Sequence, residues 1–235
     1  MAEYINIKGQ SIEVVASDPA NPTLGQIWYN STSNTLKGEG YAAGSWATAN
    51  NMNTAREILA GAGTQTAALG FGGYNGPPYT AATEEYNGST WTANPTGLNT
   101  ARGLLAGAGT QTSALAFGGE TPPSTAATEL YDGSTWTSNP NSMGTARYRL
   151  AGAGTQTAAL AFGGSIPPNT AATEEYDGST WTSNPTGLNT ARSQLAGCGT
   201  QTAALAFGGT TGSVTAATEE WTGAGAVVTK TITTS

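Results

Sequence analysis

A six-residue segment recurs along this chain at a constant interval of 45 residues. The copies are Tyr86-Asn-Gly-Ser-Thr-Trp91, Tyr131-Asp-Gly-Ser-Thr-Trp136 and Tyr176-Asp-Gly-Ser-Thr-Trp181, with a looser copy from Tyr41 to Trp46. Thr-Ala-Arg and Phe-Gly-Gly triplets recur in the same register. A period of this length is typical of solenoids and propellers, so we interpret the chain as a repeat array.

Each repeat has the pattern of four short β-strands. In the second full copy we expect them at residues 105–111, 113–119, 127–131 and 134–137. Gly, Pro, Asn and Ser interrupt the sequence at short intervals, and apolar residues do not recur at helical spacing over two turns. Four antiparallel strands per period predict an all-β fold in which each repeat forms one propeller blade.

The repeat also resembles a known family. An Arg enters the first strand, an apolar second strand ends in Gly-Gly, a Tyr closes the third strand, and a Trp follows about five residues later. This pattern, present four times from Arg56 to about Trp221, resembles the kelch repeat. It departs where Trp221 takes the tyrosine position of the last copy and no Trp follows. The resemblance implies a kelch-like β-propeller that serves as a binding scaffold and is not an enzyme.

The terminal segments are predicted to complete the ring. Leu24 to Gly38 has the pattern of a hairpin around a polar turn, and Asp18 to Pro22 precedes it as a loop. An unclosed propeller leaves an open edge that invites aggregation. We therefore expect residues 1–40 to complete the ring and residues 41–235 to hold the kelch-like repeats. Together they form one propeller domain of five blades, and a C-terminal strand at residues 226–232 helps to close it.

The N-terminal segment carries a second resemblance. Gly25-Gln-Ile-Trp-Tyr-Asn-Ser-Thr-Ser-Asn-Thr-Leu-Lys-Gly38 is similar to the openings of predicted structural proteins of tailed phages, especially marine ones, where kelch-like repeats follow. This implies a virion component in a head decoration, tail or fibre, made in the host cytoplasm. Its implied partners are other virion proteins or a host-surface glycan or protein, and it can be an oligomer. The alternative is a soluble cytoplasmic kelch-type adaptor or lectin-like propeller that binds a protein or glycan.

Composition excludes several other functions. The net charge is -7 and no Lys/Arg cluster offsets it, which argues against a nucleic-acid partner. Histidine is absent and Cys198 is the single cysteine, so we expect no metal, cofactor or catalytic centre. Paired glutamates such as Glu84-Glu85 point to opposite faces of a strand and form no acid/base dyad. There is no signal-peptide pattern and no apolar run of 18 residues, so we expect no membrane insertion.

Three sets of residues occupy repeated positions. Cys198 takes the position of Ala62, Ala108 and Ala153, which predicts a small buried filler. The tryptophans are expected to pack between blades, with sugar stacking as the alternative; they are Trp46, Trp91, Trp136 and Trp181. The arginines are expected to bind carbonyl groups or third-strand glutamates, with an anion-binding ring as the alternative. They are Arg56, Arg102, Arg147 and Arg192.

Two parts of the repeat differ between copies. These are the loop between the second and third strands and the two residues after each Arg. Because the chain reverses at every strand, both sets should lie on one face, and the near-identical Gln-Thr and Asp-Gly-Ser-Thr turns on the other. We interpret the variable face as a binding surface on a fixed frame, with drift in unconstrained loops as the alternative. Its candidate residues are Tyr74, Asn75, Tyr79, Glu120, Tyr148, Arg149, Ile166, Asn169 and Thr211.

Overall fold

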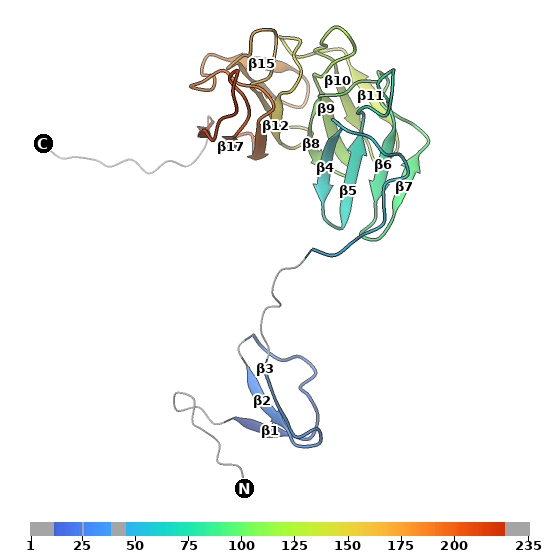
Figure 1. Ribbon diagram of the computed structural model, residues 1–235, viewed down its shortest axis with the longest axis vertical. Helices are drawn as coiled ribbons and strands as arrows, with labels where there is room; N and C mark the ends of the chain where they lie inside the picture. The colour runs from blue at the N-terminus through green and yellow to red at the C-terminus, as the bar shows by residue number, and fades with distance from the viewer. Residues whose placement is uncertain (1–11, 25, 39–45, 224–235) are drawn as a thin grey trace, which may run out of the picture. The chain divides into compact units, whose positions relative to one another are not determined.

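The computed structural model describes residues 12–24, 26–38 and 46–223 (Figure 1). The chain divides into two compact units, residues 1–48 and 49–235. The regular elements of the described residues are β-strands, and these residues contain no helix. The predicted all-β class is therefore confirmed for this part of the chain. The expected C-terminal strand at residues 226–232 and the stretch from Tyr41 to Ser45 lie outside the described residues.

The N-terminal unit contains a three-stranded sheet. Its strands are β1 (Glu13–Val15), β2 (Ile27–Asn30) and β3 (Thr35–Gly38). Strands β2 and β3 pair antiparallel, which confirms the predicted hairpin. The Asn30 side chain accepts hydrogen bonds from the backbone N–H groups of Thr32 and Ser33 at 3.0 and 2.9 Å, which closes the polar turn. Strand β1 was not predicted, and it pairs with β2 in parallel.

Asp18 holds this sheet together from the preceding loop. Its carboxylate accepts hydrogen bonds from Lys37 Nζ at 2.6 Å, Asn30 Nδ2 at 2.8 Å and Trp28 Nε1 at 3.0 Å. These donors, with Lys37 foremost, hold the pKa of Asp18 well below its usual range. The loop predicted from Asp18 to Pro22 thus contributes the anchor of the hairpin.

The repeats form four successive sheets, called here the first to the fourth sheet. The first contains β4 (Ala60–Thr64), β5 (Ala67–Phe71), β6 (Thr83–Tyr86) and β7 (Trp91–Asn94). The second contains β8 (Ala106–Thr110), β9 (Ser113–Phe117), β10 (Thr128–Tyr131) and β11 (Trp136–Asn139). The third contains β12 (Ala151–Gly154), β13 (Ala159–Phe162), β14 (Thr173–Tyr176) and β15 (Trp181–Asn184). The fourth contains β16 (Ala196–Gly199), β17 (Ala203–Phe207) and β18 (Thr218–Thr222).

Each of these four sheets is an antiparallel meander in chain order. The predicted four strands per repeat are confirmed in the first three sheets, and the described part of the fourth has three. The first strands β4, β8, β12 and β16 stand next to one another along the array. Their glycines allow this approach: a Cβ on Gly107 would lie 2.7 Å from the Phe71 ring and 2.9 Å from the Gly61 carbonyl oxygen.

Aromatic side chains fill the space between neighbouring sheets. Trp136 of the second sheet packs on Phe71 of the first with ring centroids 4.8 Å apart, and its Nε1 donates to Thr83 Oγ1 at 2.9 Å. Burial of an indole of this size contributes roughly 4 to 6 kcal/mol gross. The predicted packing role is confirmed for this residue. It is wrong for Trp46, whose side chain is fully exposed because nothing packs on it in the described part of the chain.

Cys198 also differs from its prediction, since its side chain is exposed. Its counterparts Ala108 and Ala153 are buried because each faces the next sheet along the array. The fourth sheet is the last in the described residues, so no neighbour covers the side of β16 on which Cys198 lies. Position within the array, and not residue type, decides the exposure of this thiol.

Candidate functional site

The two variable sets of residues lie together. In each repeat the residue after the Arg forms an antiparallel bridge with the residue after the second Gly of Phe-Gly-Gly. The four bridges are Glu57↔Tyr74, Gly103↔Glu120, Tyr148↔Ser165 and Ser193↔Thr210. The prediction that both sets share one face is therefore confirmed. We call this surface the variable face.

Tyr74, Tyr79 and Glu120 form a cluster on the variable face. The Tyr74 and Tyr79 rings meet edge to face with centroids 5.7 Å apart. The Tyr79 hydroxyl crosses to the loop of the second sheet and donates to Glu120 Oε2 at 2.6 Å. This bond to the carboxylate, together with burial, raises the pKa of Tyr79 to about 12. The two tyrosines are half-buried, so one part of each ring packs against the protein and the other part is exposed to solvent.

Gly103 makes room for Tyr79. A Cβ at Gly103 would lie 2.9 Å from two atoms of the Tyr79 ring and 3.0 Å from Ile58 Cδ1. The equivalent positions in the other copies carry Glu57, Tyr148 and Ser193, each with a side chain. Among the described repeats, only the position of Gly103 lacks a side chain and so leaves space for the Tyr79 ring. The combination of a Tyr in one loop and a Gly after the next Arg was the sequence signal for it.

Tyr148 and Arg149 form a second pair on this face. The Arg149 guanidinium carbon lies 5.3 Å from the centroid of the Tyr148 ring, within cation–π range. The Nε of Arg149 is buried and has no hydrogen-bond partner among the described residues. Arg149 also acts on Tyr79, whose pKa its positive charge tends to lower. The cationic group and the tyrosine cluster are therefore close enough to interact electrostatically.

A row of left-handed residues runs across the sheets at this face. Ile58, Leu104, Arg149 and Gln194 have φ angles of 50°, 54°, 57° and 55°. Such angles are uncommon outside glycine. Backbone hydrogen bonds join these four residues from sheet to sheet. The N–H of Leu104 donates to the Ile58 carbonyl at 2.9 Å, that of Arg149 to the Leu104 carbonyl at 2.8 Å, and that of Gln194 to the Arg149 carbonyl at 2.9 Å. Sequence reasoning missed this row because side chains at these positions share no chemical type.

The third and fourth loops complete the variable face. Ile166 is exposed, and Asn169 Nδ2 donates to the Thr210 carbonyl at 2.8 Å, which ties the third loop to the fourth. Thr211 lies exposed in a tight turn where its N–H donates to the Ser213 carbonyl at 3.1 Å. Asn75 is exposed beside Tyr74. The predicted residues thus fall into a tyrosine–glutamate cluster, a tyrosine–arginine pair and an outer polar group.

The near-identical turns make internal hydrogen bonds. Gln111 Nε2 donates to the carbonyls of Ala68 and Tyr86 in the preceding sheet at 3.0 and 2.6 Å. Gln156 and Gln201 repeat this pattern one and two sheets further on. In the Asp-Gly-Ser-Thr turns the aspartate accepts from two backbone N–H groups, which lowers the pKa of Asp132 and of Asp177. These turns keep their sequence because they join and close the strands.

The four repeated arginines are internal. Each side chain is fully buried and forms an ion pair with the third-strand glutamate of its sheet. The pairs are Arg56–Glu84, Arg102–Glu129, Arg147–Glu174 and Arg192–Glu219. Each guanidinium also donates to a second-strand carbonyl. These contacts match the expected structural role, and they correct the alternative of an anion-binding ring, because no guanidinium in the set faces solvent.

The adjacent glutamates Glu84 and Glu85 have different partners, as expected for neighbouring residues that point to opposite faces of a strand. Glu84 binds Arg56 inside its sheet, whereas Glu85 accepts from Asn94 Nδ2 at 2.9 Å. The pair therefore does not converge on one point. Within residues 12–24, 26–38 and 46–223, no three His, Cys, Asp or Glu side chains lie close enough to hold a metal ion. The same residues include no helix that is long and apolar enough to cross a membrane.

Comparisons with known proteins assign no family. The chain matches no family model, and no curated protein resembles it in sequence to a significant degree. The geometry of the variable face is therefore the basis for any functional assignment.

Proposed function

We propose that this protein is a non-enzymatic structural and binding component of a tailed-phage virion. Its variable face binds a host-surface glycan or protein, or another virion protein. The observation that carries the proposal is the cluster of Tyr74, Tyr79 and Glu120, which is held in place by its own contacts and still reaches solvent. The resemblance of residues 25–38 to the openings of predicted structural proteins of tailed phages favours a location on a particle made in the host cytoplasm.

The chemistry of the cluster suits recognition of a polar, ring-shaped or peptide surface. Tyrosine rings offer a large amphipathic area at low cost in conformational entropy. Glu120 has one carboxylate oxygen bound to Tyr79, and its other oxygen makes no described hydrogen bond. That oxygen can accept from a sugar hydroxyl or a backbone N–H. The turns on the other side are already used in bonds between sheets, which favours the variable face as the ligand side.

The scaffold we propose is a closed kelch-like propeller. The four sheets of residues 49–223 serve as blades, and the terminal segments complete the ring, with residues 1–40 contributing a fifth blade. The regular succession of the sheets and their shared pattern of ion pairs support this arrangement.

Removal of residues 1–40 should then leave an incomplete ring. We expect the truncated protein to melt at a lower temperature or to self-associate, because an uncovered sheet is left exposed. Circular dichroism melts and sedimentation velocity of the two forms measure this. A truncated protein that stays monomeric with an unchanged melting temperature would show that the N-terminal sheet is an appendage.

Replacing Tyr74 and Tyr79 together with alanine should weaken binding without unfolding the protein. Loss of two aromatic contacts is expected to reduce affinity at least tenfold. Binding is measured on a glycan array and to proteins of purified particles, and the melting curve checks the fold. The matched control is Asp177→Ala in an invariant turn, which should leave binding unchanged.

If binding followed the Asp177 substitution instead, the two faces would be assigned the wrong way round. A mass-spectrometric inventory of purified particles tests the location independently. Absence of the protein from particles would favour the cytoplasmic adaptor or lectin-like propeller.

A further inference from the structure

One positive charge on the variable face has no carboxylate partner among the described residues. Residues 46–223 contain five cationic side chains, all of them arginines. Four are buried in ion pairs with third-strand glutamates: Arg56, Arg102, Arg147 and Arg192. The fifth is Arg149, which forms no ion pair with the described part of the chain. Its charge is therefore not neutralised as the other four are.

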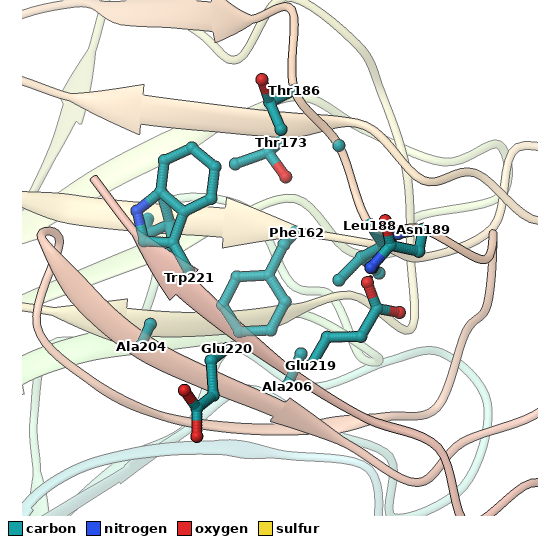
Figure 2. A pocket seen from close by; sticks show the side chains of 12 residues that line it. Phe162, Thr173, Thr186, Leu188, Asn189, Ala204, Ala206, Glu219, Glu220 and Trp221 are labelled. Carbon is teal, nitrogen blue, oxygen red and sulfur yellow. Dashed lines mark hydrogen bonds between the residues drawn. The ribbon is translucent and has the colours of Figure 1, made fainter. Parts of the chain in front are cut away.

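The glutamates of the repeats are already committed elsewhere. Even Glu219, the most exposed member of the third-strand series, is bound to the arginine of its own sheet and accepts from the Asn189 N–H at 2.6 Å. Figure 2 shows Glu219 beside Asn189 in the wall of a pocket between the third and fourth sheets. On the variable face, Glu120 accepts from the Tyr79 hydroxyl at 2.6 Å. The described residues thus provide no carboxylate to Arg149.

The Arg149 guanidinium is positioned by its own surroundings. Its central carbon lies 5.3 Å from the centroid of the Tyr148 ring, and the backbone of Arg149 is fixed in the left-handed row. The Nε atom is buried without a hydrogen-bond partner, whereas Nη1 and Nη2 are not enclosed and make no hydrogen bond with the described residues. Two such nitrogen atoms, side by side in one plane, bind a carboxylate through both of its oxygens.

Arg149 lies next to the tyrosine–glutamate cluster. Its N–H donates to the carbonyl of Leu104 at 2.8 Å, and strands paired by such bonds lie about 5 Å apart. The residue before Leu104 is Gly103, which forms a bridge with Glu120 and leaves space for the Tyr79 ring. One ligand can therefore contact the guanidinium and the cluster together.

The charges around this site decide which kind of anion it accepts. The whole chain has a net charge of -7, and Glu57 and Glu120 lie on the same face as Arg149. A polyanion such as a nucleic acid or a densely sulfated chain is repelled by this surplus of negative charge. A single carboxylate, in contrast, is matched to one guanidinium. Glu120 also keeps one oxygen without a described hydrogen bond, and this oxygen can accept from a hydroxyl group.

We propose that the variable face binds an acidic glycan, whose sugar carboxylate is held by Nη1 and Nη2 of Arg149. A hydroxyl group of the same glycan donates to Glu120, and one face of a sugar packs on the Tyr79 ring. A sugar acid carries a carboxylate and several hydroxyl groups on one ring, so it supplies both polar groups at once. This inference rests on the proposed function and narrows the ligand of the variable face to glycans that contain such sugars.

A peptide with an acidic side chain fits this face less well. A peptide that adds to a sheet binds through its main chain, which requires unpaired backbone groups on the protein. At this face the backbone is already paired, through the bridges Gly103↔Glu120 and Tyr148↔Ser165 and through the hydrogen bonds of the left-handed row. A glycan instead needs side-chain donors and acceptors beside an aromatic ring, which this face provides.

The test uses the full-length protein and an array of uronic-acid and sialylated oligosaccharides, each beside its carboxyl-reduced form, together with glutamate-rich peptides. We expect the acidic forms to bind at least about tenfold more tightly than the reduced forms, because a charged hydrogen-bonded pair is lost on reduction. The tightest pair is then titrated by calorimetry. Arg149→Gln should weaken binding of the acidic form at least about tenfold and leave that of the reduced form unchanged, as direct coupling of the two groups requires.

The chain supplies a matched control for Arg149→Gln. Gln194 occupies the same row with a φ angle of 55°, so a glutamine is compatible with the backbone at position 149. Gln194→Ala should leave the affinity unchanged. Arg149→Lys keeps the charge but loses the planar fork, and its affinity should fall between those of the natural protein and Arg149→Gln. Arg149→Gln removes only a cation–π contact from the fold, so its melting temperature should stay within about 4 °C of the natural protein.

A larger fall in melting temperature would overturn the proposal, because it would show that a carboxylate of this chain already binds Arg149. Tighter binding of the peptides, equal binding of acidic and reduced glycans, or full affinity in Arg149→Gln would overturn it as well. The proposed function is decided separately. Binding that is lost when Tyr74 and Tyr79 are replaced but kept in Arg149→Gln would leave that function standing and remove only the acidic ligand. Binding that depends on none of these residues would contradict both.

Discussion

Replacing Glu129 with alanine should lower the free energy of unfolding by about 3 to 5 kcal/mol, because a buried charge then loses its partner. Arg102 is fully buried and its Nη1 lies 2.5 Å from Glu129 Oε1. The same carboxylate also accepts from the backbone N–H and the side chain of Asn99 at 2.6 and 2.9 Å. Chemical denaturation followed by circular dichroism measures the loss.

The double variant Arg102→Met with Glu129→Leu is the control for this prediction. It removes both charges and should be clearly more stable than Glu129→Ala alone. Glu219→Ala in the fourth sheet offers a second comparison, because this glutamate is more exposed than Glu129 and its loss should cost less. Equal stability of Glu129→Ala and the natural protein would mean that the guanidinium is solvated after all.

Trp136→Ala should cost about 3 to 5 kcal/mol of stability, since it opens a cavity between the first and second sheets. The indole contacts the Phe71 ring and the Tyr131 ring, the latter with ring centroids 5.0 Å apart, and its Nε1 donates to Thr83 Oγ1. Thr83→Val removes only the acceptor and should cost about 1 kcal/mol. Denaturant titration of both single variants and the double variant separates packing from hydrogen bonding.

In the double variant the effect of Thr83→Val should largely vanish, because its donor is already gone. A cost below about 1 kcal/mol for Trp136→Ala would contradict a structural role for this residue.

Much of the repeat fold could be predicted from the sequence. The spacing of Trp-containing turns and Gly-Gly triplets located the strands of the second sheet to within a few residues. Chain reversal at every strand predicted that both variable sets lie on one face, and the bridges from Glu57 to Tyr74 and from Tyr148 to Ser165 agree. These predictions succeed because they depend on local chain reversal and on a period that repeats.

Other features depend on neighbours that the repeat alone does not describe. The exposure of Cys198 follows from its place in the last sheet of the described residues, which a periodic pattern does not encode. The contact from Tyr79 to Glu120 joins two different copies, so no single repeat contains it. Strand β1, which pairs in parallel with β2, has only three residues. So short a segment shows no detectable alternation of apolar and polar residues, and the sequence therefore did not predict it.

The left-handed row from Ile58 to Gln194 has an evolutionary consequence. Its bonds from sheet to sheet use only main-chain atoms, so the joint between sheets does not depend on the side chain carried at each step. Ile, Leu, Arg and Gln all occupy the row, although the left-handed conformation disfavours a β-branched residue such as Ile58. Selection can therefore change charge, size and polarity there one sheet at a time. The row is a set of exchangeable positions whose side chains can differ while the main-chain frame stays constant.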